Sequence, residues 1–224
     1  MVSVYLHGPK WFFGADASLM AFSALIAFCV AFASFRLYRM TKEKKYAFFT
    51  ASFILLTLSF ISRALTDSIL EEIMFSVPAQ YAGLVFFAGY VTHILLALTA
   101  YLLLIIITHK ITDKRIIALL FLVLVPSMLL SGSYYLSFYG LSVIFLAFIS
   151  IAYFQNYRKV CSAASCLVFI AFVLLTLSQV QFLLEGIRIL SLEIVRPYVY
   201  VAAHITQAVG YLVILFALVK TLLK

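Results

Sequence analysis

Long apolar stretches separated by short polar ones make up most of the chain. Within each stretch the apolar residues are continuous and do not alternate with polar residues, a pattern that favours helices over membrane-spanning β-strands. A helix needs about 20 residues to cross a hydrocarbon layer of about 30 Å. The pattern therefore predicts an all-α protein with seven transmembrane helices, at approximately 15–38, 46–71, 79–108, 115–131, 134–155, 162–190 and 197–221.

The composition agrees with a chain embedded in lipid. Of the 224 residues, 66% are hydrophobic and 11% are charged, and the mean hydropathy is +1.17. A soluble domain of this length needs a far more polar surface. We therefore expect residues 1–224 to form a single transmembrane domain of a multi-pass cell-membrane protein, with the lipid bilayer as its main partner.

The basic residues predict the orientation of the helices. Of the 16 lysine and arginine residues, twelve fall after the first, third and fifth predicted helices or at the end of the chain: Arg36, Arg39, Lys42, Lys44, Lys45, Lys110, Lys114, Arg115, Arg158, Lys159, Lys220 and Lys224. By the positive-inside rule, the N-terminus lies outside and the C-terminus inside. The net charge of +8 is then a consequence of topology, and we expect no nucleic-acid partner.

The chain contains an internal repeat. Shifting the sequence by 119 residues aligns 24–59 with 143–178 without a gap, and ten of the 36 positions are identical, including the whole of LLTLS at 55–59 and 174–178. A shift of 111 residues aligns His93 with His204 in the following helices. The sequence thus predicts two parallel three-helix repeats, at about 15–108 and 134–221, joined by a linker helix at about 115–131.

This 3+1+3 plan, with the N-terminus outside, resembles that of the sugar-transporting SWEET and PQ-loop proteins. The resemblance lies in the topology, because the chain has no Pro-Gln dipeptide and its nearest stretch is VPAQ at 77–80. In helix number and character the chain also resembles the seven-helix membrane sensor modules that precede many prokaryotic histidine kinases. The first resemblance implies a solute transporter, and the second implies a signal-input module.

Several polar residues recur at similar depth in the outer half of the predicted bundle. Arg63 and Asp67 are four residues apart on one helix and can pair. Asp16 is a candidate cap of the first helix. Ionisable groups inside a membrane usually face the bundle interior, because contact with lipid is costly. We therefore expect one polar network or ligand site formed by Arg63, Asp67, His93, Gln181, Glu185, His204 and Gln207. The alternative is that these groups only fix the packing or reach the lipid headgroups.

The candidate chemistry favours binding over catalysis. No HExxH motif, serine elbow, Walker loop or Rossmann turn is present, and we expect neither an enzyme nor a bound metal or other cofactor. The leading interpretation is ligand sensing, with the signal passed to a membrane or cytoplasmic partner. The alternatives are a SWEET-like or proton-coupled carrier of small solutes, an electron-transfer protein with haem b held by His93 and His204, and a structural subunit of a membrane complex.

Overall fold

The computed structural model describes residues 15–73, 79–129, 133–187 and 196–223, which form seven α-helices. The predicted bounds agree with the observed ones to within about five residues. The joints at 74–78 and 188–195 lie outside the described residues. The helices are α1 Ala15–Thr41, α2 Lys44–Ile73, α3 Ala79–Thr108, α4 Lys114–Leu129, α5 Tyr134–Val160, α6 Ala163–Ile187 and α7 Arg196–Leu222.

Six of these helices are long and apolar enough to cross a membrane, so the chain is a helical integral membrane protein. The described part of α4 has 16 residues and contains Pro126. At a rise of about 1.5 Å per residue it is shorter than a hydrocarbon layer of about 30 Å. The predicted fourth transmembrane span therefore does not meet the length that the other six helices reach.

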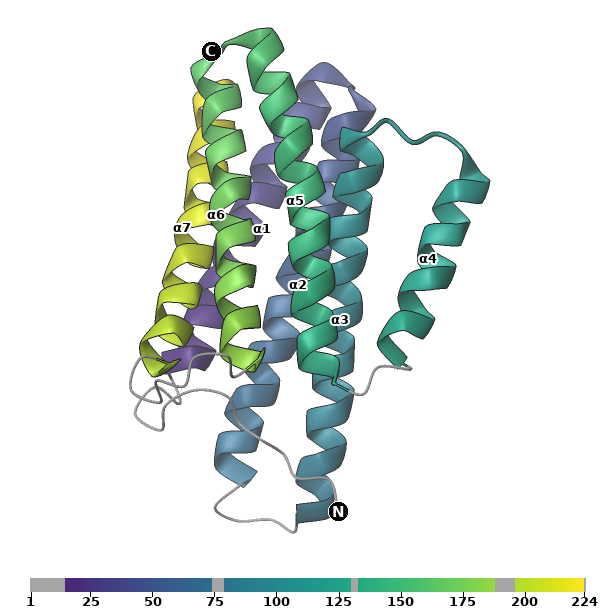
Figure 1. The fold of residues 1–224 in the computed structure, drawn as a ribbon. Coiled ribbons are helices and arrows are strands. Elements are labelled where there is room, and N and C mark those ends of the chain that lie inside the picture. Colours follow the sequence, from purple (N-terminus) through teal and green to yellow (C-terminus); the bar gives the residue numbers. More distant parts are fainter. Residues whose placement is uncertain (1–14, 74–78, 130–132, 188–195, 224) are drawn as a thin grey trace.

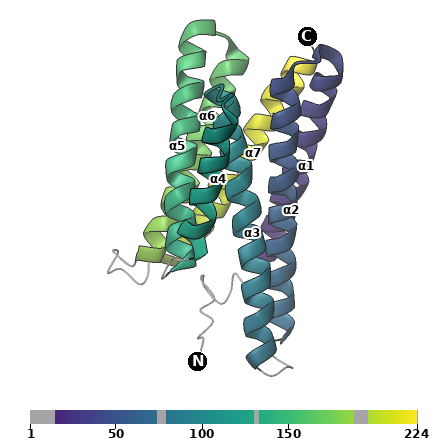
Figure 2. The same ribbon diagram turned by 90° about the vertical axis from the view of Figure 1, so that its right-hand side faces the viewer.

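The six long helices lie side by side in a bundle (Figure 1), and their contacts close into a ring. Each packs against the next in the order α1, α2, α3, α5, α6, α7, and α7 packs back against α1. α4 lies beside the ring and contacts α3 and α5 (Figures 1 and 2). The ring interior is filled by large buried side chains such as Phe53, Phe60, Phe172 and Tyr211. Large apolar side chains also cover the outside, as expected of a surface that faces lipid.

The described basic residues gather at one end of the bundle, the upper end in Figure 1, where α1 joins α2, α3 joins α4 and α5 joins α6. Three of these helix ends carry a residue in the left-handed conformation, Lys42 (φ 57°), Lys110 (φ 54°) and Cys161 (φ 49°). Left-handed residues commonly end helices, because the chain turns there while its backbone N–H still bonds back to the last turn. Arg63, which is buried inside the ring, and Arg196, the first residue of α7, are the exceptions among the described basic residues.

Close packing of α2 and α3 requires glycine at position 89. Ser62 Oγ donates a hydrogen bond to the Gly89 carbonyl oxygen at 3.2 Å. A β-carbon at Gly89 would overlap the Thr66 side chain and would lie 2.9 Å from its Cβ atom. The Thr66 hydroxyl is held by a 2.7 Å hydrogen bond to the Ser62 carbonyl oxygen, so it cannot easily turn away.

We therefore expect Gly89→Ala to lower the free energy of unfolding by about 1–3 kcal/mol, the usual cost of overpacking. Gly83→Ala on the same helix is the matched control, because a β-carbon there has no neighbour within 4 Å. Denaturant unfolding in detergent would measure both. Equal stability of the two variants would contradict the close approach of α2 and α3.

Candidate functional site

Arg63 lies at the centre of a buried polar cluster. Its side chain, on α2, is 3% exposed. Nη1 donates a hydrogen bond to the Tyr139 hydroxyl at 2.9 Å, and Nη2 donates to the Tyr200 hydroxyl at 3.3 Å. Nε lies 3.5 Å from Asp67 Oδ2, so the pair expected from the four-residue spacing is present. The guanidinium therefore has partners on α2, α5 and α7.

Asp16 in the first turn of α1 completes this cluster. Its Oδ2 atom accepts a 2.6 Å hydrogen bond from the Tyr200 hydroxyl and lies 3.9 Å from Arg63 Nη2. Its Oδ1 atom lies 3.1 Å from His204 Nε2. We refer to Asp16, Arg63, Asp67, Tyr139, Tyr200 and His204 as the ionic cluster.

The ionic cluster joins the first three helices to the last three. Arg63 and Asp16 belong to α1–α3, whereas Tyr139, Tyr200 and His204 belong to α5–α7. Tyr200 and His204 are four residues apart on α7 and so share one helix face. Taking one member from a buried charged cluster leaves the others unpaired at high cost. The cluster therefore fixes the two groups of helices together at the end of the bundle opposite the basic joints.

His93 on α3 has a separate partner. Its Nδ1 atom lies 2.7 Å from Ser59 Oγ and 3.1 Å from the Ser59 carbonyl oxygen, while Ser59 Oγ donates to the His93 carbonyl oxygen at 2.9 Å. A carbonyl oxygen can only accept, and Ser59 uses its own proton on the His93 carbonyl oxygen, so the hydrogen bonds assign a proton to Nδ1. We take the ring as neutral, because a second buried cation next to the same cavity as Arg63 would be costly. Nε2 is then an acceptor, and it is buried without a hydrogen-bond partner among the described residues.

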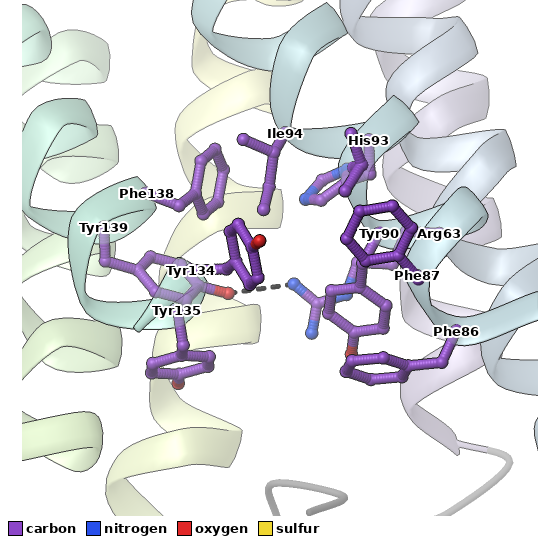
Figure 3. Close-up of a pocket in the computed structure, with 11 residues that line it drawn as sticks. Arg63, Phe86, Phe87, Tyr90, His93, Ile94, Tyr134, Tyr135, Phe138 and Tyr139 are labelled. Carbon is purple, nitrogen blue, oxygen red and sulfur yellow. Dashed lines mark hydrogen bonds between the residues drawn. The ribbon is translucent and has the colours of Figure 1, made fainter. Parts of the chain in front are cut away.

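A cavity of about 70 Å³ lies beside Arg63 and His93. Figure 3 shows Arg63 and Tyr139 joined across it by a hydrogen bond, with aromatic rings from α3 on one side and from α5 on the other. Its described lining is mostly aromatic, with Arg63 and His93 as the nitrogen-bearing side chains among these residues: Arg63, Phe86, Phe87, Tyr90, Val91, His93, Ile94, Tyr134, Tyr135, Phe138 and Tyr139.

A smaller cavity of about 10 Å³, the size of about one water molecule, adjoins the first. Arg63, His93 and Tyr139 line both cavities. Gln179 and Gln207 line the smaller one and are 2% and 5% exposed. The expectation that Gln207 faces the bundle interior agrees with this placement. Gln179 is an interior residue that the sequence analysis did not single out.

The seven predicted residues lie in different surroundings. Arg63, Asp67 and His204 are in the ionic cluster, whereas His93 and Gln207 line the cavities beside it. Glu185 is buried and accepts a 2.9 Å hydrogen bond from the Tyr135 hydroxyl. Gln181 is half-buried on α6. Among the described residues the carboxylates within ion-pair distance of Arg63 are those of Asp16 and Asp67.

The sequence analysis missed three further members of the ionic cluster. Asp16 was expected only to cap a helix, and Tyr139 and Tyr200 were not among the candidate site residues. Tyr200 precedes His204 by one helical turn, and this spacing was an available signal. Tyr139 has no comparable signal in the sequence. The position of Tyr139 follows from the packing of α5 next to α3. This packing brings the Tyr139 hydroxyl within hydrogen-bond distance of Arg63.

The two intramembrane histidines do not fit a haem held between them. His204 Nε2 faces Asp16 at 3.1 Å, so this nitrogen already has a protein partner. His93 Nε2 faces cavities of about 70 and 10 Å³, which are too small for a porphyrin ring. In the described part of the chain no group of three or more histidine, cysteine or acidic residues could hold a metal ion. The site is suited to hydrogen bonding and ion pairing.

Comparison of the chain with protein-family models, with curated proteins and with solved structures gave no match. The function must therefore be argued from the geometry of the site.

Proposed function

We propose that the protein is a ligand sensor of the cell membrane, in which a small molecule binds in the cavity beside Arg63. The observation that carries the proposal is that Arg63 has two roles. It lines the cavity, and it makes hydrogen bonds from α2 to Tyr139 on α5 and Tyr200 on α7. A ligand that engages Arg63 or moves Tyr139 would change the bonds that hold the two groups of helices together.

The two groups of helices behave as repeats in this proposal. Every buried residue of α6 lies 119 positions after a buried residue of α2; the α6 residues are Ala171, Phe172, Leu175, Ser178, Gln179, Phe182 and Glu185. The α1–α7 contact also has a counterpart in the α5–α3 contact, as a twofold relation requires. These features support the expected 3+1+3 arrangement, with α4 as the linker.

The ends of α1 and α5 support the same repeat. Lys42 and Cys161, which are 119 residues apart, both adopt the left-handed conformation. Each donates its backbone N–H to a tyrosine carbonyl oxygen at 2.8 Å, Lys42 to Tyr38 and Cys161 to Tyr157. Tyr38 and Tyr157 are also 119 residues apart. α1 and α5 therefore end in the same way, and this likeness does not depend on their apolar composition.

The proposed orientation places the ionic cluster near the outer face and the basic joints in the cytoplasm. It predicts that an impermeant maleimide will not label the exposed Cys161 in intact cells and will label it after permeabilisation. A variant with Cys161→Ala and Ser68→Cys, at an exposed position near the other end of α2, should react in intact cells. Cys29 and Cys166 are replaced by alanine in both. Labelling of Cys161 in intact cells would contradict the proposed orientation and would place the basic end outside.

The signal is proposed to pass along the helices to a partner at the cytoplasmic end. A ligand shifts a two-state equilibrium only if it contacts the two states differently. Contact with Arg63 and Tyr139 meets this condition, because the same groups hold α2 to α5. The state without the Arg63–Tyr139 bond would differ at the far ends of α1 and α5, where the basic residues lie.

The test measures this coupling directly. Spin labels at Met40→Cys, which is 68% exposed in the native protein, and at the native Cys161 report the separation of α1 and α5 at the basic end. Tyr139→Phe removes one hydrogen bond of Arg63 at the other end, and we expect it to shift the distance distribution. Tyr157→Phe on the same helix is the control. A folded Tyr139→Phe variant with an unchanged distribution would refute coupling between the site and the basic end.

A carrier of small solutes is the second candidate, favoured by one observation. The smaller cavity lies between the two groups of helices. Residues of α1–α3 and of α5–α7 line it, and Gln179 and Gln207 are among them. Carriers built from parallel repeats bind their substrates between the repeats. Uptake of a solute by liposomes that contain only this protein would favour the carrier, whereas a sensor needs its partner to produce an effect.

A further inference from the structure

We propose that the cavity beside Arg63 selects a small uncharged molecule that carries both a hydrogen-bond acceptor and a hydrogen-bond donor, such as a primary amide or an alcohol. This inference rests on the proposed function, because it names the ligand of the same cavity. It follows from the size of the cavity, from the charges of the ionic cluster and from the two nitrogen-bearing side chains in its wall.

The size limits the ligand to a few non-hydrogen atoms. The volume is about 70 Å³, whereas a protein cavity of about 150 Å³ accommodates benzene. Aromatic side chains make most of the lining, among them Phe86, Phe87 and Phe138. Such walls favour a ligand with an apolar part and exclude a strongly hydrated ion, which would lose its water without replacement.

The charges nearby favour a neutral ligand. The ionic cluster contains two carboxylates, Asp16 and Asp67, and one guanidinium, Arg63. An anion in the cavity would add a third negative charge to this buried group. A cation would lie directly against Arg63, which lines the cavity. In a medium of low polarity both arrangements are costly, so the charged forms of a ligand are disfavoured.

Arg63 supplies the donor. A guanidinium has five N–H groups. Nε faces Asp67, Nη2 faces Tyr200 and Asp16, and Nη1 donates to Tyr139. Among the described residues, no partner takes the second N–H of Nη1, and this nitrogen belongs to the cavity wall that Figure 3 shows. A carbonyl or hydroxyl oxygen of the ligand would accept from it.

His93 supplies the acceptor. Its Nδ1 proton is committed to Ser59, so the unshared electron pair of Nε2 is available. Nε2 is buried and has no hydrogen-bond partner among the described residues. Burial without a partner is costly for a polar atom. The His93 ring and the Arg63 guanidinium lie on the same side of the cavity, opposite Tyr135 (Figure 3), so one small molecule can reach both.

The test uses four probes of nearly equal shape. Acetamide has an acceptor and a donor, acetone has only an acceptor, acetate is an anion and acetamidinium is a cation. Their binding to the protein in lipid nanodiscs is measured by saturation-transfer NMR. We expect acetamide to bind saturably and about tenfold more tightly than acetone, the factor that one hydrogen bond typically contributes. Acetate and acetamidinium should bind more weakly than acetone.

Two variants separate the ligand class from the site itself. Val91→Phe places a ring in the cavity that Val91 lines and should abolish binding of every probe, whereas Val209→Phe, at a 42% exposed position on α7, should not. His93→Phe should remove the preference for acetamide over acetone, because acetamide then loses its acceptor on the protein. Equal binding of acetamide and acetone to the native protein, or tightest binding of an ion, would overturn the ligand class. Binding that Val91→Phe does not reduce would overturn the cavity as a site, and with it the proposed function.

Discussion

Replacement of Arg63 by leucine is expected to lower the free energy of unfolding by about 3–5 kcal/mol, the usual cost of removing one member of a buried charge pair. The guanidinium is 3% exposed and has two carboxylates and two tyrosine hydroxyls around it. Leucine would leave Asp67 and Asp16 without a counterion inside the bundle. Denaturant unfolding in detergent, followed by circular dichroism, would measure the effect.

The double variant Arg63→Leu with Asp67→Leu should recover part of this loss. It removes the Arg63–Asp67 pair as a whole and leaves fewer uncompensated charges than the single variant does. Lys44→Leu is the surface control, because Lys44 is exposed at the basic end. If Arg63→Leu cost no more than Lys44→Leu, the guanidinium would not hold the cluster, and the sensing proposal built on it would fail.

Lysine should not replace Arg63 either. The ammonium group of lysine has three donors on one atom. The partners of Arg63 are distributed over three nitrogens, with Asp67 near Nε, Tyr139 near Nη1 and Tyr200 near Nη2. A single nitrogen cannot reach α2, α5 and α7 with the same geometry. The need for arginine follows from the spread of partners over both groups of helices.

The helices could be predicted from the sequence because their signals are local. A continuous apolar run determines that a membrane helix forms, and the basic residues mark which ends lie together. The fourth predicted span, 115–131, has only 17 residues, which is at the lower limit of a span, and it contains Pro126. The structure gives it 16 described residues, fewer than any other helix.

The cluster was only partly predictable because its contacts are between helices. The Arg63–Asp67 pair follows from a spacing of four residues on one helix. The partner of Asp16 is His204, which is 188 residues away in the sequence, and their contact depends on α1 packing against α7. The order of helices around the ring decides such contacts. Glu185 illustrates the same limit, since it is buried as expected and its hydrogen-bond partner is Tyr135 on another helix.

Position along the helices was thus a better guide than chemical type. Several of the expected residues lie in the ionic cluster or in the cavities beside it, and the packing of neighbouring helices decides which. The division matters for function. The ionic cluster holds the helices together, while His93 is left with an unused acceptor beside a cavity. A ligand site needs such unsatisfied groups, and a structural ion pair does not.

Asp16→Asn is expected to lower the free energy of unfolding by about 3 kcal/mol, because charge-assisted hydrogen bonds contribute about 1.5–3 kcal/mol each. The carboxylate accepts from Tyr200 at 2.6 Å and faces His204 at 3.1 Å. Asparagine keeps the shape but not the charge. Glu43→Gln is the control, since Glu43 forms an exposed ion pair with Lys45 that is expected to contribute less than about 1 kcal/mol.

A double-mutant cycle with Tyr200→Phe decides whether the cluster acts as a unit. Tyr200 accepts from Arg63 and donates to Asp16, so its hydroxyl links the cation to the carboxylate. If the three groups form one unit, the double variant should be less destabilised than the sum of the single variants, by about 0.5–3 kcal/mol. Additive effects would mean that Asp16 only caps α1, as its place in the sequence first indicated. The hydrogen bond between Tyr200 on α7 and Asp16 on α1 would then be independent of the hydrogen bond between Arg63 and Tyr200.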